Sequence, residues 1–275
     1  MGKGKLKQLA KDCLPPLVTR LLRAQLGKNK AIDFSGDYAS WEDAMAASSG
    51  YDGPGILNKV KEATLKVKNG EAAFERDAVV FDHIEYSWPL LAALLWAAAR
   101  NEGKLNVLDF GGSLGSSYFQ NRKFLSSLPD VKWNVVEQEQ FVQCGRDYIQ
   151  DKQLRFYLNA DECTRENKAN ILLLCSVLSY VPNWRQVLEA LLKLKIPLVL
   201  IDRTPFILNA KERIAIQRVP EWIYPASYPC RFLEESQLLD VFTKAGYELH
   251  EEFPALGDAN IASAHKGFIF KLANK

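Results

Sequence analysis

The stretch from Leu105 to Gly115, LNVLDFGGSLG, constrains the fold of this chain more than any other. A short apolar run ends in Asp109, and four small residues follow it: Gly111, Gly112, Ser113 and Gly115. Such a run is typical of a buried strand in a parallel sheet, and residues 116–128 have the length of the helix that would follow. Small residues at a strand-to-helix turn let the backbone approach a ligand, towards which the helix amides point. The stretch therefore predicts a nucleotide-type site.

The spacing of these small residues distinguishes two classes of nucleotide site. A dinucleotide fingerprint, G-x-G-x-x-G, needs glycine at positions 113 and 116, where this chain has serine. The pattern acid-x-G-x-G-x-G fits better, with Asp109, Gly111 and Gly115 in place and Ser113 at the middle glycine position. That pattern resembles motif I of the class I S-adenosylmethionine (SAM) methyltransferases, and the resemblance implies SAM as the cofactor.

Apolar strands and helical stretches alternate regularly from Leu105 onwards. The pattern predicts five strands in this region: 105–110, 132–137, 154–157, 169–175 and 197–201. A helix over Glu234–Ala245 is followed by strands at 247–252 and 266–272 with no helix between them, as in an antiparallel hairpin. We therefore expect an α/β fold with a seven-stranded Rossmann-like methyltransferase sheet, mostly parallel with a terminal antiparallel hairpin. A six-stranded, all-parallel dinucleotide sheet does not fit this count.

The basic residues divide the chain into a terminal arm and a body. Residues 1–30 hold eight Lys or Arg and one acid, although the whole chain has 35 basic and 33 acidic residues. Leucines among them predict an amphipathic helical arm, which would pack on the body or bind an anionic membrane surface or a protein partner. We expect residues 31–104 to form an N-terminal helical extension, loop-rich at first with a short helix over Ser40–Ala47 capped by Ser40. The methyltransferase-like domain is expected over residues 105–275.

Composition and spacing exclude several classes of protein. The five cysteines are scattered without C-x-x-C spacing, so we expect neither a disulfide framework nor a zinc site. The N-terminus lacks the apolar run of a signal peptide, and the longest apolar run, 88–99, is shorter than the roughly 20 residues that span a bilayer. A cytoplasmic protein is expected, peripheral at the inner face of the membrane if the arm binds there. Nucleic acid is not expected as a partner, because the basic residues sit on the arm instead of a sheet face.

Acidic residues at the ends of the predicted strands extend the cofactor site. Glu137 ends the second strand, where a carboxylate accepts hydrogen bonds from both ribose hydroxyls. Asp109 would receive loop amides or the ammonium of the methionine moiety. Asp161, after the third strand, either holds an adenine amino group or is a plain loop residue. The residues expected to bind the cofactor are Asp109, Gly111, Gly112, Ser113, Gly115, Glu137, Asp161, Ser176 and Tyr86.

Methyl transfer needs the acceptor positioned at the methyl carbon, and a base only where the nucleophile has a proton to lose. The candidate bases are His83, Asp202 and His265. The alternative for each histidine is an ordinary structural role, and the alternative for Asp202 is to orient the arginine that follows it. No acidic cluster points to a metal, so no metal ligand is assigned. The aromatic and proline-rich segment 206–232 is expected to be irregular and to form either an acceptor pocket, in which Arg231 would contact the acceptor, or a packed cover.

Several longer phrases together resemble one family. They are ERDAVVFDHIEYSWPLLAALLWAAA (75–99), VLDFGGSLGSSY (107–118), ILLLCSVLSYVPNW (171–184), DRTPF (202–206), YPCRF (228–232) and GFIF (267–270). These phrases resemble a family of SAM-dependent methyltransferases associated with bacterial capsule, O-antigen and related polysaccharide biosynthesis. The resemblance implies O-methylation of a sugar or glycan precursor, with Asp82 and Tyr86 helping to shape the acceptor site. The alternative is a non-catalytic SAM-binding or assembly subunit of a glycan biosynthesis complex.

Overall fold

The centre of the molecule is a seven-stranded sheet, seen in a computed structural model that describes residues 32–50 and 54–273. Its strands are β4 (Lys104–Phe110), β5 (Asp130–Val136), β6 (Leu154–Tyr157), β7 (Ile171–Cys175), β8 (Leu198–Ile207), β11 (Tyr247–Pro254) and β12 (Ser263–Leu272). They lie in the order β11-β12-β8-β7-β4-β5-β6. The five strands from β6 to β8 are parallel, and β12 is antiparallel to both β8 and β11. The predicted Rossmann-like sheet with its terminal hairpin is confirmed.

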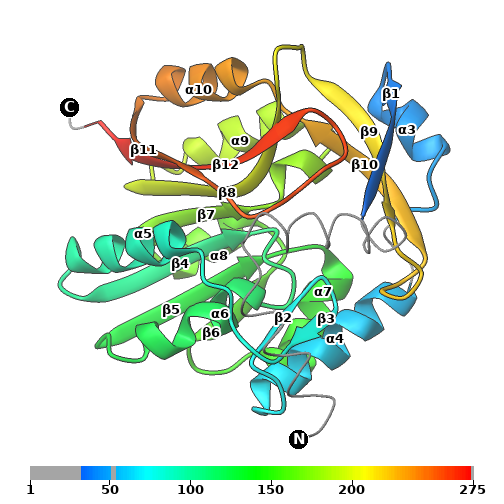
Figure 1. Ribbon diagram of the computed structural model, residues 1–275. Helices are drawn as coiled ribbons and strands as arrows, with labels where there is room; N and C mark the ends of the chain where they lie inside the picture. Colours follow the sequence, from blue (N-terminus) through cyan, green and yellow to red (C-terminus); the bar gives the residue numbers. More distant parts are fainter. Residues whose placement is uncertain (1–31, 51–53, 274–275) are drawn as a thin grey trace, which may run out of the picture.

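Helices cover both faces of this sheet (Figure 1). One face carries α4 (Pro54–Lys68), α5 (Trp88–Ala99), α6 (Ser116–Leu125), α7 (Glu139–Cys144) and the π-helical turn η1 (Gly145–Ile149). The other face carries α8 (Ala160–Glu166), the 3-10 turn η2 (Leu178–Tyr180), α9 (Trp184–Leu192) and α10 (Glu235–Lys244). Successive strand residues alternate between the two cores, as Val107 and Leu108 do. Burial on both faces explains why the parallel strands are continuously apolar.

A second, small sheet lies beyond the carboxyl ends of the parallel strands (Figure 1). Its strands β1 (Asp33–Tyr38), β9 (Arg213–Val219) and β10 (Ala226–Phe232) are antiparallel, with β9 in the middle. The expectation that residues 206–232 are irregular is therefore wrong. Pro229 does not prevent the strand, because β10 is an edge strand whose outer side needs no ladder hydrogen bonds. β8 also continues past its predicted end at Ile201, because β12 pairs with it as far as Ile207.

The region before residue 104 contains two further elements of interest. Helix α3 (Trp41–Ala46) begins after Ser40, whose hydroxyl accepts a hydrogen bond from the Asp43 amide at 3.1 Å, so the predicted cap is confirmed. A two-stranded hairpin, β2 (Phe74–Arg76) and β3 (Val79–Phe81), was not expected. Its two turn residues have positive φ angles, as a tight hairpin turn requires, but they are Asp-Ala and lack the usual glycine signal.

The hairpin is attached to the glycine turn through a buried carboxyl group. Glu75 is 1% exposed and accepts a hydrogen bond from the hydroxyl of Ser116 at the start of α6. Burial raises the pKa of Glu75 to about 7, and the bond from Ser116 lowers it in part. Because neighbouring strand residues point to opposite sides, Arg76 then faces away from α6.

The predicted division into three parts stays a prediction. Its basic arm, residues 1–30, lies outside the described residues, and so do the membrane and partner roles expected of it. The structure links the second and third parts closely, since β1 pairs with β9. Within residues 32–50 and 54–273, no helix has both the length and the apolar character needed to cross a bilayer.

Candidate active site

A cavity of about 810 Å³ lies at the carboxyl edge of the central sheet, between that edge and the small sheet. Five neighbouring strands each contribute lining residues: Glu137 follows β5, Asp109 is in β4, Ser176 follows β7, Arg203 is in β8 and His265 is in β12. We call the Asp109–Ser113 turn with Glu137 the glycine-turn half, and Arg76, Arg203 and His265 the arginine half. Ligands of open α/β sheets bind at this edge.

At two positions of the glycine-turn half, neighbouring atoms lie so close to the backbone that glycine is required. A Cβ atom on Gly111 would lie 2.3 Å from Cγ2 of Val177, and its φ of +75° also disfavours other residues. A Cβ atom on Gly112 would lie 2.4 Å from Oδ2 of Asp109. Ser113 has a φ of +52°, so the serine adopts the left-handed conformation usual for glycine at the middle position of the motif. The turn geometry therefore survives the substitution that distinguishes this chain from the motif.

The carboxyl group of Glu137 is held by the turn. One oxygen accepts a hydrogen bond from the Ser113 amide at 3.3 Å, and the other accepts from the Gln138 amide at 2.7 Å. Burial raises the pKa of Glu137, and these two amide bonds offset part of the rise. The group lines the cavity at the end of β5, where the sequence predicted it.

Asp109 is fully buried, and only one of its two carboxylate oxygens has a hydrogen-bond partner among the described residues. Its Oδ2 atom accepts a hydrogen bond from Nε1 of Trp133 at 2.8 Å, while Oδ1 has no hydrogen-bond partner among the described residues. Burial raises its pKa to about 7, the Trp133 bond lowers it, and the charge on Glu137 raises it further. A buried carboxylate oxygen without a partner is costly, so a cationic ligand group such as an ammonium would fit here.

Three residues with left-handed backbone follow one another along the sheet edge. Ser113, Ser176 and Arg203 have φ angles of +52°, +55° and +55°. Each such residue costs about 1–3 kcal/mol, and strained residues of this kind persist mainly at ligand sites. The strain is supported locally, since the Ser176 hydroxyl donates to the carbonyl of Arg203 at 3.2 Å.

The arginine half contains two guanidinium groups in one part of the cavity. Arg76 comes from β2, Arg203 comes from β8, and both line the cavity. Neither forms an ion pair or a side-chain hydrogen bond with any described residue, and Nε of Arg203 is buried. Burial lowers the pKa of Arg76, the charge on Arg203 lowers it further, and Cys175, Asp77 and Asp202 raise it in part. This half is electropositive.

His265 lies beside these arginines. Burial lowers the pKa of His265, the charge on Arg203 lowers it further, and Asp258 raises it in part. The imidazole is therefore neutral at pH 7 and able to accept a proton. It packs on the backbone of Gly257, where a Cβ atom would lie 2.3 Å from its ring.

Tyrosines from β10, from the loop before it and from η2 form another wall of the cavity. The Tyr180 hydroxyl donates to Oε1 of Gln217 at 2.6 Å, and Nε2 of Gln217 donates to the Tyr228 hydroxyl at 3.1 Å. Burial raises the pKa of Tyr224 to about 12 and that of Tyr228 well above its usual value. These phenols stay protonated and serve as hydrogen-bonding groups and apolar surface, not as bases.

The structure brings seven of the predicted site residues to the cavity: Asp109, Gly111, Gly112, Ser113, Glu137, Ser176 and His265. Gly115 is not among the lining residues, and a Cβ atom there would lie 2.9 Å from Leu154, so it serves the packing of α6 on β6. Asp161 is exposed in the first turn of α8 and does not line the cavity. Neither position supports the predicted contact with a cofactor.

Three further predictions are corrected by position. Tyr86 packs on the rings of Trp88 and Phe124, with centroids 5.0 and 5.2 Å away, outside the cavity. The side chain of His83 is 77% exposed and pairs with Asp82, itself 95% exposed, so neither lies where a base or an acceptor contact is needed. Tyr86, His83 and Asp82 all belong to the loop between β3 and α5, whose course the sequence pattern does not define.

Asp202 lies behind the cavity wall. It is 1% exposed and does not line the cavity, whereas its neighbour Arg203 does. Burial raises the pKa of Asp202, while the Ser87 hydroxyl and the charge on Arg203 lower it. Of the two roles predicted for Asp202, the position supports orienting Arg203 over acting as a base.

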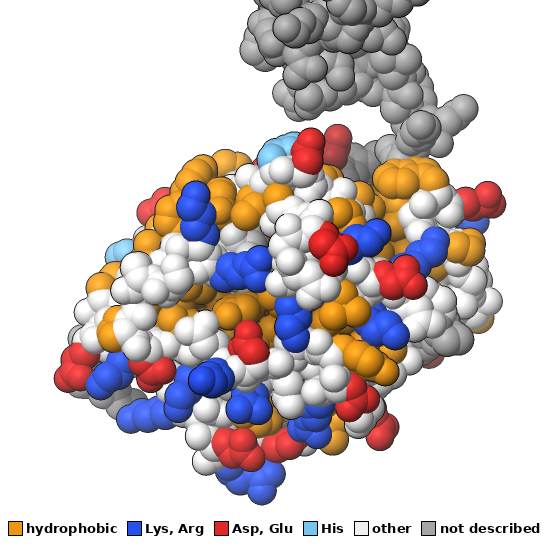
Figure 2. Space-filling view, turned by 90° about the horizontal axis from the view of Figure 1, so that it is seen from below, with side chains coloured by type: hydrophobic (Ala, Val, Ile, Leu, Met, Phe, Trp, Pro, Cys, Tyr) orange, Lys and Arg blue, Asp and Glu red, His pale blue; other side chains and the backbone are white. Residues whose placement is uncertain are grey.

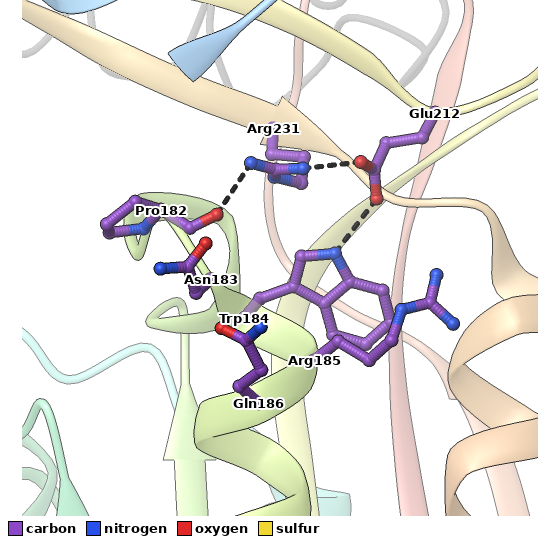
Figure 3. A pocket seen from close by; sticks show the side chains of 7 residues that line it. All are labelled: Pro182, Asn183, Trp184, Arg185, Gln186, Glu212 and Arg231. Carbon is purple, nitrogen blue, oxygen red and sulfur yellow. Dashed lines mark hydrogen bonds and ion pairs between the residues drawn. The ribbon is translucent and has the colours of Figure 1, made fainter. Parts of the chain in front are cut away.

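Arg231 does not line the cavity. Figure 3 shows its guanidinium group bonded to Glu212 and Pro182. It pairs with Glu212 and donates to the carbonyl of Pro182 at 2.9 Å, while Nε1 of Trp184 donates to the other oxygen of Glu212 at 2.9 Å. The residues that form these bonds line a separate pocket of about 220 Å³, and the bonds connect the small sheet to the start of α9. The predicted acceptor contact is wrong, because the guanidinium is already paired.

Several solved structures resemble this fold at low sequence identity. The N-terminal domain of EvdMO1, crystallised in the presence of S-adenosylhomocysteine (SAH) and D-fucose, is 13% identical over 80% of this chain and 100% of its own, with a TM-score of 0.46. The magnesium protoporphyrin IX methyltransferase ChlM from Synechocystis PCC 6803, with bound SAM, is 11% identical over 82% and 87%, with a TM-score of 0.44. A SAM-dependent methyltransferase from Methanosarcina mazei is 12% identical over 70% and 100%, with a TM-score of 0.46. Similarities this low carry no argument about ligands or activity.

No protein-family model matches the chain, and no curated protein does so either.

Proposed function

We propose that this protein is a SAM-dependent methyltransferase, and the observation that carries the proposal is the position of Glu137. Its carboxylate lines the cavity at the end of β5 and is bonded to the Ser113 amide of the glycine turn. A carboxylate in that place accepts hydrogen bonds from the two hydroxyls of a nucleoside ribose. Because Oδ1 of Asp109 has no hydrogen-bond partner in the described part of the chain, it suits the ammonium of SAM. The residues therefore fit SAM, which supplies an electrophilic methyl group when bound.

We infer that the acceptor is a hydroxyl group, since His265 can serve as the base. The imidazole is kept neutral in the arginine half and can take the hydroxyl proton as oxygen attacks. The tyrosine wall and Gln217 can orient the acceptor through hydrogen bonds, and the small sheet shields the reacting atoms from water.

A sugar hydroxyl on a glycan precursor is the acceptor we favour. Aromatic faces combined with hydroxyl and amide groups suit a ring that is partly apolar and partly polar, as sugars are. The association with polysaccharide biosynthesis rests on the sequence phrases that resemble that family.

Replacing Glu137 tests the proposed cofactor site. In Glu137→Ala, loss of a charge-assisted hydrogen bond to the ribose should weaken SAH binding by about 1–3 kcal/mol, which is about fivefold to 150-fold. The matched control is Glu139→Ala, since Glu139 is exposed in the first turn of α7 and does not line the cavity. Calorimetric titration of SAH into both variants provides the measurement. Equal affinity in the two variants would remove the ribose assignment and with it the main support for the function.

A further inference from the structure

We propose that the acceptor carries an anionic oxygen group, a carboxylate or a phosphate, which Arg76 and Arg203 hold together inside the cavity. This inference rests on the proposed methyltransferase function and adds to it the chemical class of the second substrate.

The first support is convergence. Arg76 lies in the β2–β3 hairpin and Arg203 lies in β8, more than a hundred residues later, yet both side chains line one cavity and their charges act on each other. Two like charges in partly buried positions repel each other, so this arrangement costs free energy without an anion between them. The positive φ of Arg203 adds to the cost.

The second support is that neither guanidinium pairs with an acidic group of the described residues, although that of Arg76 lies over the ring of Phe74, 5.1 Å from its centroid. Figure 2 shows that Lys and Arg side chains on the face seen from below are interspersed with acidic ones. Buried Arg231 likewise has Glu212, at 10% and 22% side-chain exposure. In contrast, no described carboxylate forms an ion pair with Arg76 or Arg203, although a charge that is partly buried without a partner is costly.

The acidic residues of the cavity do not fill that role. Asp109 and Glu137 belong to the glycine-turn half. In the sheet order, β4 lies two strands away from β8, and β5 lies three strands away. Asp77 and Asp258 are exposed at the ends of the cavity and act on Arg76 and His265 only at longer range. The charge of Asp202 acts on both arginines, but Asp202 lies behind the cavity wall and forms no ion pair with either. On the cavity side, the arginine half therefore has no carboxylate, among the described residues, that is ion-paired to it.

The cofactor does not supply the missing charge. SAM has one carboxylate but also an ammonium and a sulfonium, so its binding adds a net positive charge to the cavity. Two guanidinium groups present several N–H donors in planar forks, which match the oxygens of a phosphate or a carboxylate. The second substrate is then the source of the anion, with its reacting hydroxyl towards His265.

The test is a calorimetric titration of inorganic pyrophosphate, and separately of malonate, into the full-length protein saturated with SAH at constant ionic strength. We expect one or both anions to bind the SAH complex, and each of Arg76→Gln and Arg203→Gln to weaken that binding by about tenfold or more. Preference for pyrophosphate would assign a phosphate-bearing acceptor, and preference for malonate a carboxylate-bearing one.

Arg218→Gln is the matched control, because Arg218 is exposed on β9 and does not line the cavity; it should bind both anions as the wild type does. Unchanged SAH affinity in all three variants shows that they are folded.

If Arg76→Gln and Arg203→Gln instead lose SAH binding and no anion binds the SAH complex, the arginines hold the cofactor carboxylate and the inference is wrong. Absence of anion binding to a wild type that binds SAH would also overturn it. Failure of SAH to bind the wild type contradicts the proposed function instead, and titration of the anions into the free protein then tests the arginine pair separately.

Discussion

The glycine-turn half of the cavity is formed by residues at the ends of β4 and β5 or directly after them, whereas the arginine half gathers residues from β2, β8 and β12. The first half presents backbone amides and two carboxyl groups, and the second presents cationic and imidazole side chains. A site made by backbone at consecutive positions suits a cofactor common to many proteins. A site made by side chains from distant segments can change with the substrate, so specificity is expected in the arginine half.

Replacement of His265 should have the largest effect and should separate the two halves. His265→Gln removes the proposed base, so turnover of SAM with an acceptor found by screening should fall by about 10²–10⁴-fold, while SAH affinity stays unchanged. The control is His250→Gln, since His250 is exposed on β11 and stacks on Trp96.

The pH profile of the wild type provides a second readout of the same residue. Because burial and Arg203 lower the pKa of His265 despite Asp258, the rate should rise with pH below about 6.5 and be level at pH 7 and above. A His265→Gln enzyme with wild-type turnover would contradict the division into halves.

Gly111→Ala addresses the backbone half and should act on cofactor binding. The added Cβ atom would lie 2.3 Å from Val177 at a φ of +75°, so the turn must shift and SAH affinity should fall by about a hundredfold. Gly246→Ala separates backbone strain from this clash, because Gly246 has a φ of +82° but open space around it. That control should lose about 1 kcal/mol of stability and keep its SAH affinity. If both variants bind SAH equally well, close approach at Gly111 is not what the site needs.

Glu75→Gln tests the link between the halves, since Glu75 attaches the hairpin that carries Arg76 to Ser116. The pKa of Glu75 is raised from 4.5 to about 7 in the folded protein. The folded state therefore binds the proton more tightly than the unfolded state, and the resulting stability is present below pH 4.5 and lost as pH rises through 7. The amide keeps an acceptor for Ser116 but has no proton to lose.

Urea unfolding at pH 5 and pH 8 measures this effect. The free energy of unfolding of the wild type should decrease relative to that of Glu75→Gln by about 2 kcal/mol between these pH values. Parallel pH dependence in the two proteins would mean that Glu75 is not buried as the structure has it.

The sequence predicts the central sheet and the glycine-turn half well because their signals are local. Each parallel strand is a short apolar run, each turn has its small residues, and the acid at Glu137 follows its strand directly. The small sheet and the arginine half depend on pairing between distant segments. Phe34 pairs with Gln217, which is far from it in the sequence, and nothing near either residue specifies that register.

The histidines illustrate the same limit. His83 and His265 each have one charged and one apolar neighbour in the sequence, and the sequence alone assigned them equal roles. The pairing of His265 with Pro205 in β8 brings it to the cavity, whereas His83 lies in a loop with its side chain largely exposed. Arg76 was not singled out at all, because its hairpin turn lacks glycine and its neighbour Glu75 is an unusual residue to bury.

Calorimetric titration of the wild-type protein with SAM, SAH and NAD tests the central claim most directly. We expect about micromolar affinity for SAM and SAH and no heat of binding for NAD, because the turn has serine where a dinucleotide site needs glycine. Binding of NAD without SAM or SAH would contradict it.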